Sequence, residues 1–124
     1  MADFLITYDL KSGSPDAHKP FLTAAEKEGL LYVWKGSDYV NRLPNTTLWG
    51  LFESKEAANK AFDRALAAAG RTVGYTVTLE KRATSEMGSS AVNSDKRKAP
   101  DPRWTGKAAF ETSRRHQVND PYFK

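Results

Sequence analysis

The chain contains no cysteine among its 124 residues, and it has only two histidines and two methionines. Without thiols, disulfide bonds, thiolate metal sites and a cysteine nucleophile are excluded. No segment approaches the roughly 18 consecutive apolar residues that a membrane-spanning helix needs. The chain also does not open with a basic segment followed by a long apolar run. We therefore expect a soluble, cytoplasmic protein that does not associate with membranes.

The residues that are present suffice for one globular domain. Hydrophobic residues make up 40% of the chain and aromatic residues 11%, which is enough for an ordinary core at this length. The formal net charge is +4, and it is unevenly spread. Residues 83–124 hold eight Lys and Arg against five Asp and Glu, whereas residues 1–82 hold 11 against 10. The last third is therefore favoured as the contact for an anionic partner.

The first part of the chain has the pattern of a strand followed by a helix. Residues 4–10 are largely apolar and place the carboxylate Asp9 near the strand's end. The run 11–16 is rich in Ser, Gly and Pro and predicts a loop. Because a proline inside a helix removes a backbone hydrogen bond, the helix should begin near Lys19 or Pro20. Gly29 suits the left-handed position after its last turn.

A long hairpin is predicted next. Residues 30–35 and 46–52 have the β-branched and aromatic content of strands. The connection over residues 36–45 contains Gly, Ser, Asp, Asn and Pro, which are typical of loops. Two strands joined in this way should pair antiparallel.

A second helix and a last strand complete the pattern. Ser54 is a suitable N-cap, and apolar residues recur every three or four positions over residues 55–69. Gly70 should end this helix. Apolar and polar residues then alternate over residues 73–79, which predicts a strand with one buried face.

The order strand, helix, strand, strand, helix, strand predicts an α+β, ferredoxin-like fold (the split βαβ, or βαββαβ) over residues 1–82. We expect a four-stranded antiparallel sheet with two helices on one face. Its other face needs cover, either from a second copy or from the C-terminal extension. That extension divides into a predicted linker at residues 83–102 and an aromatic, basic C-terminal segment at residues 103–124.

With this strand order, the opening run FLITYDL (residues 4–10) resembles the Cas-two family of small CRISPR adaptation proteins and the related toxin-associated VapD-like proteins. In that family the first strand ends in a Tyr-Asp or Phe-Asp pair, which Tyr8 and Asp9 match. The resemblance covers residues 2–82 as a pattern. The chain departs from it in the loop after Asp9, which offers lysines and His18 where the family has an Arg-bearing segment.

The resemblance implies a homodimer in which the Asp9 residues of two subunits face each other across a groove. Two carboxylates would hold Mg²⁺, a hard cation that prefers oxygen ligands and keeps waters able to attack a phosphodiester. The implied protein is nucleic-acid-associated, acting on RNA or DNA. It is either a weak metal-dependent endonuclease with Asp9 as catalytic residue and metal ligand, or a relative that has lost the chemistry. The local sequence also allows Asp9 to cap the following turn or to lie at a dimer interface.

Basic and aromatic residues supply the candidate nucleic-acid contacts. Cations on loops and strand ends of the first domain would contact phosphate, although solvated loop charge is an alternative. In the C-terminal segment, rings interleaved with cations suit single-stranded nucleic acid. The candidate binding residues are Lys11, Lys19, Lys35, Arg42, Arg103, Trp104, Lys107, Arg114 and Arg115.

The C-terminal segment has a second interpretation. Its aromatic side chains would equally anchor it in a groove on a partner protein or on its own domain. The alternative function is therefore a non-enzymatic interaction module, for instance in a toxin–antitoxin or phage-related system. His18 and His116 have no partner fixed by spacing, so neither is assigned as a general base.

Overall fold

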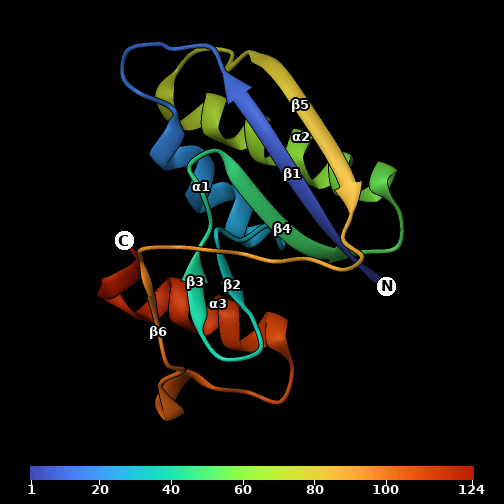
Figure 1. The fold of residues 1–124 in the computed structure, drawn as a ribbon. Helices are drawn as coiled ribbons and strands as arrows, with labels where there is room; N and C mark the ends of the chain where they lie inside the picture. Colours follow the sequence, from blue (N-terminus) through green and yellow to red (C-terminus); the bar gives the residue numbers. More distant parts are fainter.

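The computed structural model describes all residues 1–124 as an α+β protein with three α-helices and two antiparallel sheets of three strands (Figure 1). No helix is both long and apolar enough to cross a bilayer. The elements, in chain order, are β1 (Ala2–Leu10), α1 (His18–Lys27), β2 (Val33–Lys35), β3 (Val40–Arg42), β4 (Thr47–Phe52), α2 (Lys55–Val73), β5 (Leu79–Glu86), β6 (Arg97–Lys98) and α3 (Ala109–Asn119), with 3₁₀ turns at Pro102–Trp104 and Pro121–Phe123.

The first sheet has the strand order β4-β1-β5 and carries the main core on one face. Along β1, Phe4, Ile6 and Tyr8 are buried because alternate side chains of a strand point to the same face. These three pack with Phe21 of α1 and Phe62 of α2, which cover this face. The first predicted strand and the two predicted helices therefore pack together as expected, and the α+β class is confirmed.

The predicted four-stranded sheet is wrong, because β2 belongs to a second sheet of order β2-β3-β6. Only Leu31 pairs with β4, through two hydrogen bonds to Trp49 of 2.8 and 2.9 Å. Two residues later the indole N–H of Trp49 donates to the carbonyl of Val33 at 2.6 Å. Because the Trp49 side chain uses the Val33 carbonyl, this carbonyl is not available to pair with the backbone of β4. β2 pairs instead with β3, which lies within the predicted loop 36–45.

The predicted boundary between the second helix and the last strand is also wrong. Helix α2 continues past Gly70 to Val73 and ends at Gly74, which has the left-handed φ of 84°. β5 begins only at Leu79, where it pairs with Leu10. The alternation that predicted a strand over residues 73–79 arises because Val73 contacts the core from the last helical turn and Val77 is buried from the extended connection.

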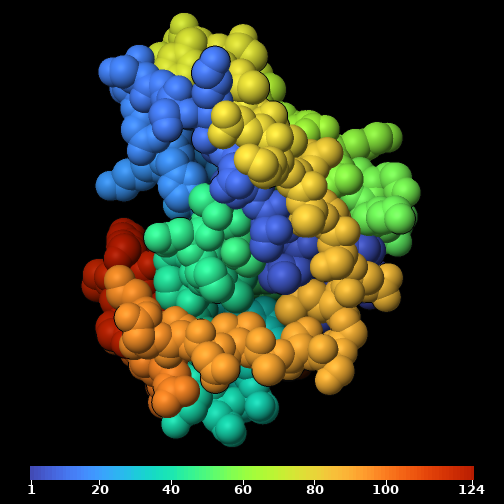
Figure 2. Space-filling view, turned by 45° about the horizontal axis from the view of Figure 1, so that its top comes forward, coloured from blue at the N-terminus to red at the C-terminus, as the bar shows by residue number.

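The C-terminal extension covers part of the second face of the first sheet. Residues 83–86 complete β5, and Met87 and Val92 then pack on the cluster around Trp49. Figure 2 shows the segment that follows β5, in orange, running across this side of the molecule toward the second sheet. Phe110 of α3 meets the Trp49 ring at a centroid distance of 5.7 Å. We expected this face to be covered either by a second copy of the chain or by the C-terminal extension. The structure shows that the C-terminal extension covers part of it.

Helix α3 takes the place of a strand along the outer edge of β2. The side-chain oxygen of Gln117 accepts the N–H groups of Tyr32 (2.8 Å) and Val33 (3.3 Å). One turn earlier, the Ser113 hydroxyl accepts the N–H of Lys35 at 2.9 Å. These contacts satisfy backbone donors that an exposed sheet edge would leave unpaired. They fix α3 against β2, while Arg114 of α3 contacts Glu26 of α1, so that α3 forms one wall of the site described next.

Candidate functional site

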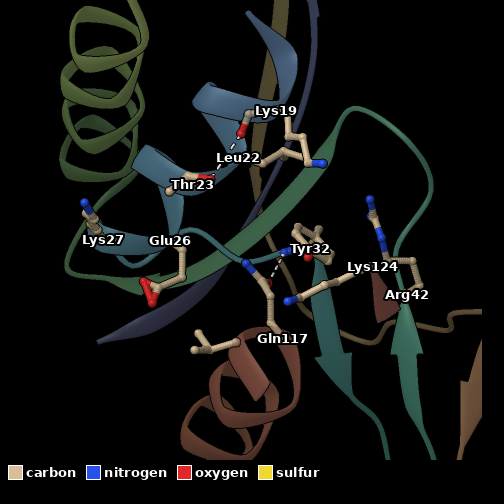
Figure 3. A pocket seen from close by; sticks show the side chains of 10 residues that line it. Lys19, Leu22, Thr23, Glu26, Lys27, Tyr32, Arg42, Gln117 and Lys124 are labelled. Atoms are coloured by element: carbon tan, nitrogen blue, oxygen red, sulfur yellow. Dashed lines mark hydrogen bonds between the residues drawn. The ribbon is translucent and has the colours of Figure 1, made fainter. Parts of the chain in front are cut away.

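A pocket of about 570 Å³ lies between α1, the start of the second sheet and the end of α3 (Figure 3). We call it the basic pocket. It is lined by Lys19, Leu22, Thr23, Glu26, Lys27, Tyr32, Arg42, Gln117, Val118 and Lys124.

Helix α1 supplies one wall of the basic pocket. Residues at intervals of three and four lie on one side of a helix, so that Lys19, Leu22, Glu26 and Lys27 share a face while Phe21 is buried in the core. The amines of Lys19 and Lys27 make no hydrogen bond or ion pair within the chain. Helical spacing therefore brings two unpaired ammonium groups to the same pocket.

Arg42, at the end of β3, is held by stacking. Its guanidinium carbon lies 3.8 Å from the centre of the Tyr32 ring, and one of its N–H groups donates to the carbonyl of Leu43 at 3.2 Å. No carboxylate pairs with it. Burial lowers the pKa of Arg42, and the neighbouring hydroxyls of Tyr32 and Tyr8 act in the opposite direction. The result is a guanidinium held in place by an aromatic ring, with most of its donors free.

The other lining groups leave the pocket cationic. Glu26 is the only carboxylate side chain in the lining, and Arg114 already contacts it, with an N–O distance of 3.3 Å. The side-chain oxygen of Gln117 accepts hydrogen bonds from the backbone at the start of β2, so its amide N–H₂ group remains a free donor. The Lys124 amine has no partner within the chain, and Figure 3 shows the Lys124 side chain extending past Tyr32 toward Gln117. The lining thus includes four cations, of which only Arg42 makes a side-chain hydrogen bond within the chain, and Figure 3 shows Lys27 apart from the other three, with its amine pointing away from them.

Of the nine predicted nucleic-acid contacts, the structure brings only Lys19 and Arg42 together in this pocket. Lys11 and Lys107 are exposed elsewhere. The Lys35 amine donates to the carbonyls of Gly36 and Ser37.

Apart from Lys107, the predicted contacts in the C-terminal segment are engaged within the chain. Arg103 pairs with Asp101 at 2.8 Å, and these hydrogen bonds lower the pKa of Asp101 to about 2. Arg114 pairs with Glu26 and Arg115 with Glu111. The Trp104 ring packs edge-on against His116.

The aromatic anchors of the C-terminal segment pack against the chain itself. Phe123 is fully buried with Val33 and Val40 of the second sheet. His116 is also fully buried: its Nδ1 lies 2.8 Å from the Thr112 carbonyl, and its Nε2 accepts the N–H of Asp101 at 3.0 Å. Both ring nitrogens therefore have structural partners.

Sequence reasoning missed Lys27, Tyr32, Gln117 and Lys124 as pocket residues. The spacing of eight between Lys19 and Lys27 is a usable signal, since it places both on one helix face. The other three come together only through the docking of α3 on β2, for which no local pattern gives a sign.

Asp9 lies outside the basic pocket. It is exposed at the end of β1 and lines a smaller hollow of about 150 Å³ together with Asp16 and His18. His18 forms a 3.0 Å hydrogen bond with the buried Tyr8 hydroxyl. Burial lowers the pKa of His18, as does Arg42, while Asp16 raises it. No group of three or more His, Asp or Glu side chains is placed to share a metal ion, and the role of Asp9 across a homodimer stays a prediction.

Comparison of the chain with protein-family models, curated proteins and solved structures finds no match to any of them.

Proposed function

We propose that the protein binds single-stranded nucleic acid, with the basic pocket as its phosphate site. The observation that carries this proposal is that Lys19, Lys27, Arg42 and Lys124 all line one pocket and that none of them has a carboxylate side chain as partner. Cations held close together raise the local concentration of phosphate-bearing ligands. An arginine whose guanidinium N–H groups are free is the side chain best suited to bind phosphate, because two parallel N–H groups can donate to two phosphate oxygens.

A nucleic acid fits the pocket better than a bare inorganic anion. Leu22 and Val118 face the same pocket as the cations, and Val118 is 49% exposed. Apolar side chains near cations suit a ligand that combines a flat base with a phosphate, as a nucleotide does. The predicted contacts in the C-terminal segment are less suitable, because Arg103, Arg114 and Arg115 already have carboxylate partners.

Fluorescence anisotropy with labelled single-stranded oligonucleotides tests the proposal. Lys19→Gln and Arg42→Gln should each weaken binding by about tenfold and reduce its salt dependence, because each removes one phosphate contact. Lys60→Gln is the matched control, since it removes an exposed cation of α2 that lies outside the pocket. Equal affinity for the pocket variants and the wild type would rule out this site.

A second candidate function is Mg²⁺-dependent cleavage by Asp9 paired across a homodimer. The observation that favours it is the exposure of Asp9 beside a hollow that Asp16 and His18 also line. Incubation of RNA and DNA with the protein and Mg²⁺, in parallel with Asp9→Asn, tests this function. Cleavage that survives the substitution would remove Asp9 from the mechanism.

A further inference from the structure

A second hollow adjoins the basic pocket. It has a volume of about 510 Å³ and shares Arg42 and Lys124 with the basic pocket as lining residues. Its remaining lining comes from the loop after β3 and the segment before β6, namely Leu43, Pro44, Asn45, Asn93, Ser94, Asp95 and Lys96. Arg42 and Lys124 therefore form the border between two hollows, each within the size range of small-ligand sites, about 300–1,000 Å³.

The two hollows differ in chemistry. The basic pocket offers the apolar side chains Leu22 and Val118 and the ring of Tyr32. The second hollow offers polar side chains, of which Asn45, Asn93 and Asp95 are exposed and make no side-chain hydrogen bond within the chain. One hollow suits stacking or apolar contact, and the other suits hydrogen bonding.

We propose, on the basis of the proposed function, that the two hollows bind two consecutive nucleotides of RNA, with the connecting phosphate on Arg42 and Lys124. A phosphodiester carries one negative charge between two nucleosides, which matches two cations between two hollows. The Arg42 guanidinium has five N–H donors, and its single side-chain hydrogen bond goes to the Leu43 carbonyl. The remaining donors suit the non-bridging phosphate oxygens.

The polar hollow is the reason for choosing RNA over DNA. A ribose 2′-OH is both a donor and an acceptor, and it is the group by which proteins distinguish the two nucleic acids. The Asp95 carboxylate accepts from such a hydroxyl, and the amides of Asn45 and Asn93 both donate and accept. Lys96 also lines this hollow, but its amine already donates to the Lys124 carbonyl at 2.9 Å, whereas the unpaired Asp95 would repel a second phosphate. The site therefore suits a ribonucleoside beside one phosphate rather than a run of phosphates.

Competition against a labelled single-stranded RNA tests the inference. The competitors are the ribodinucleoside monophosphate ApA, its deoxy analogue, and AMP. Because ApA alone fills both hollows and presents the 2′-OH, it should displace the RNA at a concentration about tenfold lower than either of the others, the effect of roughly one hydrogen bond. The double variant Asn93→Ala, Asp95→Ala, which removes both hydrogen-bonding side chains, should abolish this preference for ApA. Ser89→Ala, an exposed position of the same segment outside the hollow, should preserve it.

The outcomes separate this inference from the proposed function. If AMP competes as well as ApA, the two-nucleotide site is wrong, and if the deoxy analogue does, the preference for RNA is wrong. In both cases the loss of oligonucleotide binding in Arg42→Gln would still support the basic pocket. If no oligonucleotide binds, the proposed function fails, and direct titration of ApA against the folded protein decides the inference. Absence of binding to ApA there would overturn it.

Discussion

The guanidinium of Arg42 lies over the ring of Tyr32, with its central carbon 3.8 Å from the ring centroid. Burial of a cation against an aromatic face fixes its direction without neutralising its charge. The backbone at Tyr32 is itself held in place, because its N–H donates to the side chain of Gln117 of α3. The docking of α3 thereby orients the one arginine of the basic pocket, which links the fold of the C-terminal segment to the proposed binding function.

Arg42→Lys separates the geometry of this cation from its charge. Lysine keeps the positive charge but loses the planar fork and most of the stacking on Tyr32. We expect the affinity for single-stranded oligonucleotides to fall by about threefold, less than in Arg42→Gln, while the salt dependence of binding is retained. Arg71→Lys, the same substitution at an exposed position of α2, should leave binding unchanged. An unchanged affinity for Arg42→Lys would show that charge alone accounts for the contact.

Gln117 should contribute to both stability and binding, and two substitutions distinguish these roles. Gln117→Leu leaves the N–H groups of Tyr32 and Val33 without an acceptor and should lower the free energy of unfolding by about 2–3 kcal/mol. Gln117→Glu keeps an acceptor oxygen there but adds a negative charge to the pocket. It should therefore cost less stability than Gln117→Leu while weakening oligonucleotide binding. Urea unfolding and anisotropy measure the two effects, and equal losses of stability would contradict the role of the acceptor.

Gly50 of β4 should tolerate no side chain. A Cβ there would clash with the carbonyl oxygen of Gly29, a backbone atom just after α1. Gly29 itself has a φ of 85°, so the turn that carries this oxygen is fixed. We expect Gly50→Ala to destabilise the protein by about 2–3 kcal/mol through overpacking. Gly88→Ala is the control, because its Cβ would meet no atom within 4 Å, and it should change stability by less than about 0.5 kcal/mol.

The elements with strong local signals were predictable from the sequence. The Ser54 side chain accepts the N–H of Ala57 at 3.1 Å as the expected N-cap of α2. Gly29 takes the expected left-handed conformation after α1. In both cases the determining interactions lie within a few residues of each other, so that a local pattern contains them.

The second sheet and the basic pocket were not predictable, because they depend on contacts between distant residues. β2 leaves β4 where the Trp49 indole takes the Val33 carbonyl, and its outer edge is completed by Gln117, 85 residues after Tyr32. Neither interaction has a periodic pattern. The basic pocket depends on the same distant contacts, because Lys19 lies in one pocket with Gln117 and Lys124 only when α3 is docked on β2.

His18 should make stability depend on pH. Burial is the main cause that lowers its pKa, Arg42 adds to the effect, and Asp16 opposes it. The unfolded chain, with a histidine pKa near 6.5, therefore binds a proton more readily than the folded protein. Stability contributed by neutral His18 should be complete above about pH 7 and decline as the pH falls through 6.5 toward the lower folded pKa. Thermal unfolding of wild type and His18→Gln at several pH values measures this, and parallel curves for the two proteins would contradict it.

Lys98 of β6 and Asp120 form the ion pair that closes the C-terminal segment. Their N–O distance is 2.6 Å, and the Asp120 side chain is only 4% exposed. Burial acts to raise the pKa of Asp120, but the contacts with Lys98 and with the N–H of Tyr122 outweigh it, so the pKa is lowered.

Lys98→Met would leave the Asp120 carboxylate buried without its cation, and we expect a loss of roughly 2–3 kcal/mol in the free energy of unfolding. Adding Asp120→Asn should recover part of that loss, because the amide is uncharged and still accepts from the Tyr122 N–H. Chemical denaturation of the single and double variants measures the coupling. If the two losses simply add, the pair does not interact, and the packing of Lys98 against Trp104 and Tyr122 would instead account for its effect.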